Sequence, residues 1–308
     1  MNAPRQRIVR RALHGVLLLD KPVGLSSNDA LQKAKRLLNA EKAGHTGTLD
    51  PLASGLLPLC FGAATKFSQL SLDADKRYTA TLHLGVKTST GDLEGDVIER
   101  REVNIDRAAI DAAIARFTGA IDQTPPMHSA LKHKGRALYE YAREGVEVER
   151  EARHITIHRL TVTEWHEHTL VLDVLCSKGT YVRTLAEDIG AALGCGAHLS
   201  ALRRTASGPL TIDAAITLDA LAALTDAERD AHLLPPDALL ADWPEHRLPA
   251  HEAARFLTGL RRRVNAPDAP RIRVYGPEQR ALLGSAHITA GELIPDRLLS
   301  PLEIESLS

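Results

Sequence analysis

The chain has 308 residues, of which 44% are hydrophobic and 25% are charged, a balance that is ordinary for a folded soluble protein. Its net charge of −1 gives no overall sign of nucleic-acid binding, and no apolar run approaches the length of a membrane span. Three widely spaced cysteines without a C-x-x-C pair exclude a zinc ribbon and a redox motif. The length suits two domains, or one large domain and a small one.

Charge is spread unevenly along the chain. Residues 1–50 carry nine Lys or Arg and four acids, a net of +5, whereas residues 211–308 carry ten Arg and fifteen acids, a net of −5. A neutral total can therefore hide a basic face, although uneven charge is also common on a solvated surface. The first fifteen residues hold no uninterrupted apolar stretch and the number of cysteines is odd, so we expect a cytoplasmic protein.

The N-terminal part predicts a flexible basic arm at residues 1–12, followed by a strand and a helix. The apolar run at 15–19 predicts a buried strand that ends in a turn at Asp20. Ser26, with Asp29 three residues later, fits a variant of the capping box, and apolar residues then recur at helical spacing. A strand, a turn and an amphipathic helix therefore open the folded part of the chain.

Residues 44–55, GHTGTLDPLASG, contain one acid, Asp50, among small, apolar and hydroxyl residues. Pro51 biases Asp50 towards an extended backbone, and the glycines let the chain turn sharply or approach a ligand closely. An isolated carboxylate on such a loop is either a satisfied turn residue or a catalytic group, because a carboxylate can act alone as a nucleophile or a base. The spacing alone leaves both interpretations open.

Patterns between residues 77 and 193 predict strands and helices of a mixed sheet. In residues 77–85 every second side chain is apolar, which predicts a half-buried strand with Tyr78 on its apolar face. The other predicted elements are, in order, a polar loop at 86–96, helices at 107–118 and about 137–143, strands at 153–162 and 168–177, and a helix at 181–193.

The character of the chain changes after residue 212. Residues 212–242 are rich in Ala, Leu and Asp, which predicts helices packed on the outside of the main body. We expect a linker at 243–249 and then a small β-rich domain at 250–308, near the lower size limit for independent folding.

Familiar catalytic motifs are absent from the sequence. It contains no P-loop, no G-x-G-x-x-G after a strand, no H-E-x-x-H and no G-x-S-x-G, and no tight cluster of His, Asp and Cys suggests a metal site. The acid on the glycine-rich loop and a basic, aromatic segment at 132–143 remain as candidates for function.

Five blocks of sequence occur in an order shared with a known family: GVLLLDKPVGLSS (15–27), GHTGTLDPLASGLLPLCFGAATK (44–66), RYTATLHLGVKTSTGDLEG (77–95), QTPPMHSALKHKGRALYEYAREG (123–145) and SKGTYVRTLAEDIG (177–190). They resemble the TruB family of bacterial tRNA pseudouridine synthases. The resemblance implies an α+β fold with a mixed, mostly antiparallel sheet flanked by helices and loops. It implies a catalytic domain at 13–245 with a tRNA-gripping insertion at about 124–152, and a PUA-like RNA-binding domain at 250–308.

The resemblance also implies an activity, the isomerisation of uridine-55 in the TΨC loop of tRNA to pseudouridine. This reaction breaks the N1–C1′ bond, turns the uracil and joins C5 to C1′, so it is redox-neutral and implies no cofactor and no metal. Asp50 matches the catalytic aspartate of the family. Its action is either attack at C1′ or removal of the 2′-proton, and the sequence does not choose between them.

Three further matches concern the catalytic aspartate and the flipped uracil. Tyr78 matches the tyrosine that stacks on it, Arg183 matches the arginine that pairs with the catalytic aspartate, and His45 matches a histidine that enters the space left by the base. A stacking ring and a filling side chain offset the few kcal/mol that base flipping costs. Without the resemblance, these residues would be interpreted as a core tyrosine, a surface arginine and a solvated histidine.

Other matches concern the pocket and the loops around it. Tyr181 and Leu202 match residues that line the uridine pocket, and Lys21 matches a lysine that supports the active-site loops. From the residues alone, Leu202 would be a core residue and Lys21 a turn lysine. His128 departs from the family, which often has Tyr or Phe there, and this puts one local contact in doubt.

The resemblance implies that the partner of this protein is tRNA. Contacts with the T-arm are expected from the basic arm and from four residues of the insertion, Lys132, Lys134, Arg136 and Arg143. Contacts with the acceptor stem are expected from the last domain, where Arg261, Arg262 and Arg263 could serve. No membrane and no obligate protein partner is expected, so the protein should be a monomer.

Two alternatives to a stand-alone enzyme remain open. One is an RNA chaperone of the same fold, a role that can coexist with catalysis, although an intact set of Asp50, Tyr78 and Arg183 favours catalysis. The other is a guide-RNA-dependent relative, and the absence of long Lys-rich tails argues against it.

Overall fold

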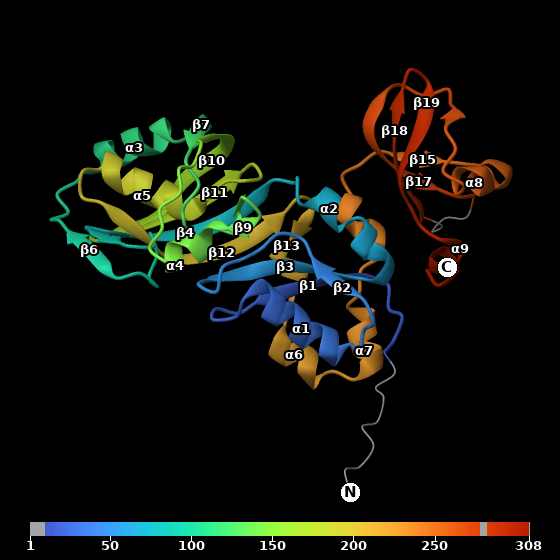
Figure 1. Ribbon diagram of the computed structural model, residues 1–308, viewed down its shortest axis with the longest axis horizontal. Helices are drawn as coiled ribbons and strands as arrows, with labels where there is room; N and C mark the ends of the chain where they lie inside the picture. Colours follow the sequence, from blue (N-terminus) through green and yellow to red (C-terminus); the bar gives the residue numbers. More distant parts are fainter. Residues whose placement is uncertain (1–9, 278–281, 308) are drawn as a thin grey trace, which may run out of the picture. The chain divides into compact units, whose positions relative to one another are not determined.

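The computed structural model describes residues 10–277 and 282–307, and Figure 1 traces them. The predicted basic arm therefore lies mostly outside the described residues. Arg11, near its end, is held in place: its backbone N–H donates to the carbonyl of Asn39, its carbonyl accepts from Glu41, and its guanidinium pairs with Asp230. None of the described helices is long and apolar enough to cross a membrane.

The chain forms two compact units. The first contains Met1–Asp50, Gly55–Leu72 and Gly208–Ser308, and the second contains Pro51–Ser54 and Asp73–Ser207. Each unit therefore combines segments that are distant in sequence, and each is described by itself below.

The first unit is built around strand β1 (Gly15–Lys21). This strand runs antiparallel to β3 (Ala53–Phe61) and parallel to β14 (Ile216–Thr217), and β3 also pairs with β2 (Ala43–His45). Residues on both faces of β1 are buried, as its uninterrupted apolar run predicts. The strand does not end at Asp20 as expected, because Lys21 still pairs with Gly55 of β3.

Helix α1 (Ser27–Leu37) follows β1 and confirms the predicted helix. The Ser26 hydroxyl accepts a hydrogen bond from the backbone N–H of Asp29 at 3.1 Å, which satisfies one free donor of the first turn. Ala30, Leu31 and Ala34 are buried on one face of the helix. Its basic residues lie mainly on the exposed faces, so α1 is amphipathic.

Short elements complete the main body of the first unit, including the predicted helices at 212–242. They are η1 (Gly62–Lys66), α2 (Ser68–Ser71), β13 (Leu210–Thr211), η2 (Ile212–Ala214), α6 (Leu218–Ala223), α7 (Asp226–Ala231) and η3 (Pro236–Leu240).

The C-terminal part of the first unit is β-rich. Its sheet has the order β15-β17-β18-β19-β16, with strands Glu245–Arg247, Ala269–Tyr275, Leu282–Thr289, Glu292–Leu298 and Arg262–Arg263, and it carries α8 (Ala250–Phe256) and α9 (Pro301–Glu305). The expected linker at 243–249 is wrong in one respect, because it contains β15. That strand pairs in parallel with β17, a contact distant in sequence that local patterns do not reveal.

The second unit is an antiparallel sheet in the order β12-β4-β11-β10-β7. These strands are Ala197–Ser207, Lys76–Leu84, Thr169–Cys176, Arg153–His166 and Gly119–Gln123. Helices α3 (Arg107–Arg116) and α5 (Val182–Ala192) contribute Ile110, Leu185 and Ile189 to the core that the sheet forms. The mixed, mostly antiparallel α+β fold is confirmed.

Two segments of the second unit stand outside this sheet. Residues 86–96 are not a simple polar loop, because β5 (Val86–Thr88) pairs with β6 (Val97–Arg100) to form a hairpin around the polar turn. The other segment holds β8 (Lys132–His133), β9 (Arg136–Ala137) and α4 (Leu138–Arg143).

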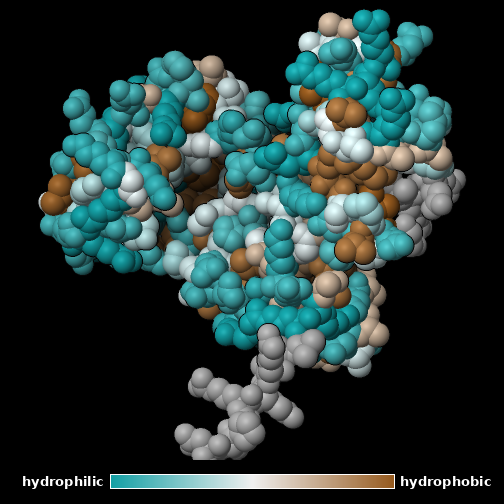
Figure 2. All heavy atoms as spheres, turned by 45° about the vertical axis from the view of Figure 1, so that its right-hand side comes forward, coloured by the Kyte–Doolittle hydropathy of each residue, from teal (hydrophilic) through white to brown (hydrophobic). Residues whose placement is uncertain are grey.

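On the face shown in Figure 2 the surface is mostly hydrophilic, with hydrophobic side chains gathered in a few patches.

Candidate active site

Asp50 lies in the first unit, on the loop between β2 and β3. The backbone just before it is fixed by Ser27 of α1, whose hydroxyl accepts from the N–H of Leu49 at 2.7 Å and donates to its carbonyl at 3.0 Å. Leu49 is buried, whereas Asp50 is exposed. The loop thus presents its carboxylate from a backbone that α1 holds in place.

The glycines beside Asp50 have the conformations that their spacing predicts. Gly47 and Gly55 have positive φ angles of 79° and 100°, a region that residues with a Cβ rarely adopt. The N–H of Thr46 donates to the carbonyl of Pro58 at 3.1 Å, which ties the start of the loop to β3.

Lys21 and His45 lie in the same unit as Asp50. The Lys21 side chain is fully buried, and its ammonium group donates to the carbonyls of Pro22 and Leu25 at 2.9 and 2.7 Å. A buried cation requires such partners, and here they close the loop that follows β1. His45 is half-buried at the end of β2, opposite Leu59 of β3.

Tyr78 and Leu202 lie in the second unit, on adjacent strands. Tyr78 is near the start of β4 and Leu202 pairs with Ala80 of the same strand. Both side chains are partly buried and pack against the core of this unit. Each therefore combines an anchored side with an accessible one, which suits contact with a base.

Arg183 stands in the first turn of α5 and is nearly buried, with 8% of its surface exposed. Its Nε lies 3.1 Å from Oδ2 of Asp92, a carboxylate that is 3% exposed. Its Nη1 also donates to the carbonyls of Thr90 and His128, both at 3.4 Å. This pairing with Asp92 compensates for the burial of the guanidinium charge.

Asp92 was missed by the sequence analysis, although it lies within a block that resembles the family. Its Oδ1 accepts from the Thr90 hydroxyl at 2.5 Å and from the N–H of Glu94 at 3.1 Å, the pattern of an Asx turn. The local signal for this turn is the Thr-Gly-Asp sequence at 90–92, with a further glycine three residues later. Nothing local indicates the partner, because Arg183 is distant in sequence.

Tyr181 precedes α5 and is held by another residue that the sequence analysis missed, Gln123 of β7. The Gln123 side-chain amide accepts from the N–H of Tyr181 at 2.7 Å and donates to its carbonyl at 3.0 Å. The second unit thus fixes Tyr181 and Arg183 at the N-cap and in the first turn of the same helix. It places both near the segment that follows residue 123.

The four predicted RNA contacts of the insertion differ in their surroundings. Lys132 and Lys134 are exposed, and no carboxylate within residues 10–277 and 282–307 lies within ion-pair distance of either. Arg136 pairs with Glu140 at 3.0 Å and with Glu144, and its hydrogen bonds to Glu144 lower the pKa of that carboxyl.

Aromatic rings complete this segment. The guanidinium of Arg136 lies 4.7 Å from the ring centre of Tyr141, and that of Arg143 lies 5.3 Å from the ring centre of Tyr139. Arg136 is therefore engaged inside the segment, whereas the two lysines face solvent.

Residues 35–182 match the TruB family pseudouridylate synthase N-terminal domain, and residues 183–241 match the tRNA pseudouridylate synthase B C-terminal domain. A Burkholderia mallei protein named tRNA pseudouridine synthase B is 61% identical, over 96% of this chain and 97% of that protein. The chain belongs to the TruB family of pseudouridylate synthases. This confirms the resemblance seen in the sequence.

Other similarities of this TruB-family chain extend over nearly its whole length. Residues 244–299 match the C-terminal region of pseudouridine synthase II TruB. A Cupriavidus pinatubonensis protein of the same name as the Burkholderia protein is 60% identical, over 95% of this chain and 96% of that protein.

Solved structures support the fold of this TruB-family chain. The crystal structure of a Cbf5-Nop10-Gar1 complex matches with a TM-score of 0.74 and 27% identity, over 94% of this chain and 86% of that chain. An H/ACA RNP bound to a substrate RNA containing 2′-deoxyuridine matches with a TM-score of 0.72 and 26% identity, over 94% and 86%.

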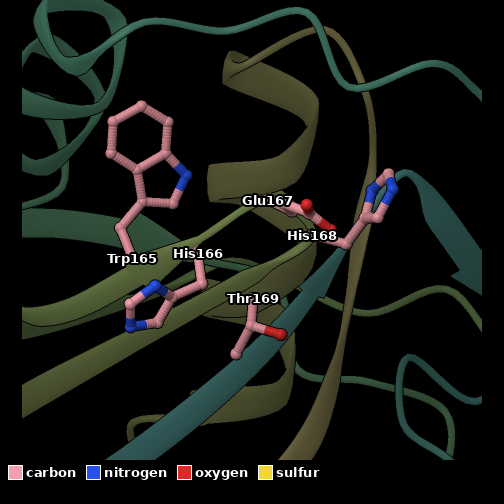
Figure 3. Close-up of a pocket in the computed structure, with 5 residues that line it drawn as sticks. All are labelled: Trp165, His166, Glu167, His168 and Thr169. Atoms are coloured by element: carbon pink, nitrogen blue, oxygen red, sulfur yellow. The ribbon is translucent and has the colours of Figure 1, made fainter.

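A surface pocket elsewhere in this TruB-family protein does not resemble a catalytic site. It is lined by Trp165, His166, Glu167, His168 and Thr169 at the turn between β10 and β11. Figure 3 shows side chains that point in different directions rather than towards one centre. Among the described residues, no group of three or more His, Cys, Asp or Glu could hold a metal ion.

Proposed function

We propose that this TruB-family protein isomerises uridine-55 in the TΨC loop of tRNA to pseudouridine. The observation that carries the proposal is the exposed Asp50 on a glycine-rich loop whose backbone is fixed by Ser27. The near full-length similarity to proteins named tRNA pseudouridine synthase B supports tRNA as the substrate.

The reaction needs one carboxylate and a means to hold the uracil while it turns. Asp50 either attacks C1′, which displaces the uracil as an anion, or removes the 2′-proton of the ribose. After the ring has turned, C5 bonds to C1′, either as the Asp50–C1′ bond breaks or as C2′ regains its proton. C5 then loses its proton and N1 gains one. Atoms and electrons balance without an electron carrier, so the chemistry requires no cofactor.

The uridine-binding roles follow the family match. Tyr78 stacks on the flipped uracil, Tyr181 and Leu202 line its pocket, and His45 fills the space that the base leaves. The partial burial of Tyr78 and Leu202 supports these roles, because one side of each packs on the core.

The two cations have separate roles in the proposal. Lys21 supports the loop that follows β1, in line with its hydrogen bonds to Pro22 and Leu25. Arg183 is proposed as the partner of the Asp50 carboxylate, and this pairing stays a prediction. Its buried ion pair with Asp92 supports a fixed orientation of the guanidinium.

The remaining proposals concern how the protein works on tRNA. The insertion grips the T-arm through Lys132, Lys134 and Arg143, and Arg136 orders the segment. A PUA-like C-terminal domain contacts the acceptor stem. We expect a cytoplasmic monomer, with an accessory role in tRNA folding.

Mapping of pseudouridine in an unmodified tRNA transcript tests the proposed function. Purified protein should place pseudouridine at position 55 of the transcript and nowhere else. A transcript with cytidine at that position should stay unmodified. Absence of pseudouridine from the T-loop of the first transcript would refute the activity, and modification at another position would refute the site.

A further inference from the structure

Gln123 is a polar residue at a position where strand β7 faces the core. Side chains alternate along a strand, and here Ile121 packs on the core of the second unit, whereas Ala120 and Asp122 are exposed. Gln123 follows the core-facing alternation and is only 3% exposed. An apolar residue would fit this environment more simply, so the buried amide calls for a specific partner.

That partner is the backbone of Tyr181. The amide oxygen of Gln123 accepts from the Tyr181 N–H at 2.7 Å, and the amide nitrogen donates to the Tyr181 carbonyl at 3.0 Å. The side chain thus uses its acceptor on the N–H and its donor on the carbonyl of the same residue. Such a pair of bonds fixes position as well as distance.

This contact matters because Tyr181 lies at the start of α5. Tyr181 is the N-cap residue of the helix, and its side chain makes no capping hydrogen bond. Helix starts are usually fixed by a Ser, Thr, Asp or Asn at this position. Here the amide of Gln123 holds the start of the helix from outside, two residues before Arg183.

A further hydrogen bond joins Arg183 to the segment that begins after Gln123. Its Nη1 donates to the carbonyl of His128 at 3.4 Å. The next carbonyl, that of Ser129, accepts from the N–H of Tyr139 in α4 at 3.0 Å. Tyr181 and Arg183, both proposed to act on the uridine, are therefore hydrogen-bonded to the proposed tRNA-gripping segment or to the residue before it.

We propose that Gln123 is a positioning residue for pseudouridylation. It holds the backbone of Tyr181, and through it the first turn of α5 with Arg183, in the orientation that the reaction requires. Because Gln123 is the last residue of β7, it also ties this orientation to the start of the RNA-binding segment. The inference rests on the proposed function, since it assumes that Tyr181 and Arg183 act on the uridine.

Gln123→Glu separates the two hydrogen bonds of this contact. The new side chain has nearly the same shape and can still accept from the Tyr181 N–H. Its ionised second oxygen cannot donate and instead faces the Tyr181 carbonyl, so a hydrogen bond is replaced by a repulsive contact between two acceptors. The carbonyl keeps its hydrogen bond from the N–H of Leu185. Protonation of the carboxyl restores the donor, so the defect should weaken as the pH falls.

The experiment compares Gln123→Glu with wild type in single-turnover pseudouridylation of full-length tRNA transcript between pH 6 and pH 8.5. At pH 8.5 the rate should fall about tenfold, the effect of one lost buried hydrogen bond, while the tRNA dissociation constant changes less than twofold. The ratio of variant to wild-type rate should rise towards 1 at pH 6. Asp122→Asn, the exposed neighbour on the same strand, should match wild type throughout.

Three outcomes would overturn the inference. A Gln123→Glu rate within twofold of wild type at pH 8.5 would show that the contact does not position the site. A slow rate with no recovery at pH 6 would show that the lost donor is not the cause. If Gln123→Glu does not fold, Gln123→Met provides the comparison, and unfolding of both would make Gln123 a folding residue only.

Different results would refute the role of Gln123 and the proposed function. A wild-type protein that forms no pseudouridine refutes the function itself. An active wild type with an equally active Gln123→Glu refutes only the role of Gln123.

Discussion

The buried ion pair between Arg183 and Asp92 is the most constrained feature of the candidate site at the scale of single residues. Both side chains are nearly excluded from water, so removal of one charge takes a close counter-charge away from the other. Four further hydrogen bonds fix their geometry. Asp92 accepts from the Thr90 hydroxyl and the N–H of Glu94. Arg183 donates to the carbonyls of Thr90 and His128.

Asp92→Asn should therefore affect both stability and turnover. We expect the free energy of unfolding to fall by about 3 kcal/mol, because the buried Arg183 charge loses the Asp92 counter-charge 3.1 Å away. Turnover should fall at least about tenfold, since the guanidinium can then reorient. Urea unfolding and single-turnover rates measure the two effects. Asp96→Asn, an exposed acid on the same turn, is the control, and an equal effect of both variants would contradict the role of the pair.

The sequence predicted single residues only where the family match names them. Asp50, Tyr78 and Arg183 were found because they match family residues with known roles, although their roles here remain predictions. Asp92 and Gln123 lie within the same blocks of sequence, but no family role was matched to them. No strand was predicted at 119–123, so the core-facing position of Gln123 in β7 was not apparent from the sequence. The partners of both residues depend on pairings distant in sequence.

At the scale of elements, strong local patterns predicted the structure well. The strand at β1 and the helix at α1 followed from an apolar run and a serine cap. The hairpin of β5 and β6 was missed, because residues 86–96 are dominated by polar turn residues and its strands are short. Cross-strand pairing holds such strands in place, and one segment of sequence does not contain that information.

The insertion allows a prediction on salt dependence. Lys132→Ala with Lys134→Ala should lower tRNA affinity and reduce the slope of log affinity against log salt by about 1.5, roughly 0.7–0.9 for each lost phosphate contact. Arg136→Ala should leave the slope nearly unchanged, because Arg136 already pairs with Glu140 and Glu144. Filter binding at several salt concentrations measures the slope for the double lysine variant and for Arg136→Ala. A larger loss of slope for Arg136→Ala than for the two lysines would reverse this assignment.

Helix α5 carries a carboxyl whose titration should affect stability. Burial raises the pKa of Glu187 above its ordinary value of 4.5, and the nearby Asp188 raises it further, while Lys87 and Arg183 act in the opposite direction. The folded state therefore holds this proton more tightly than the unfolded state. The stability of the folded state consequently falls as the pH rises through 4.5 towards the folded pKa.

Glu187→Gln removes this titration. At pH 7 the variant should have a higher free energy of unfolding than wild type, and the difference should shrink as the pH falls through 4.5. Urea unfolding at pH 4 and pH 7 measures it, with the exposed Glu149→Gln as control. A variant less stable than wild type at pH 7 would mean that attraction to Lys87 and Arg183 outweighs burial.

At the scale of the whole molecule, the C-terminal β-rich part shares a core with the N-terminal segment of the first unit. Tyr275, Leu282 and Leu299 belong to the same buried cluster as Val16 and Leu56. The Lys66 ammonium donates to the carbonyl of Leu298 at 2.9 Å and pairs with Glu303 at 2.5 Å. The sequence suggested a small appendage here, because local patterns do not show such shared burial.

Removal of residues 244–308 should therefore destabilise what remains. The deletion uncovers apolar side chains of the shared cluster, so we expect the urea midpoint to fall relative to the full chain. Circular dichroism measures the midpoint. A truncated protein with the midpoint of the full chain would show that the two parts are energetically independent.

The most direct test of the central claim, that Asp50 is the catalytic residue of a tRNA pseudouridine synthase, is single-turnover pseudouridylation by Asp50→Asn measured together with tRNA affinity. The account predicts no pseudouridine at position 55 and a dissociation constant within about tenfold of wild type, roughly 1.4 kcal/mol, because the change preserves the shape of the loop. Pseudouridine formation by the variant at the wild-type rate would contradict it, and joint loss of binding and turnover would make Asp50 a structural residue.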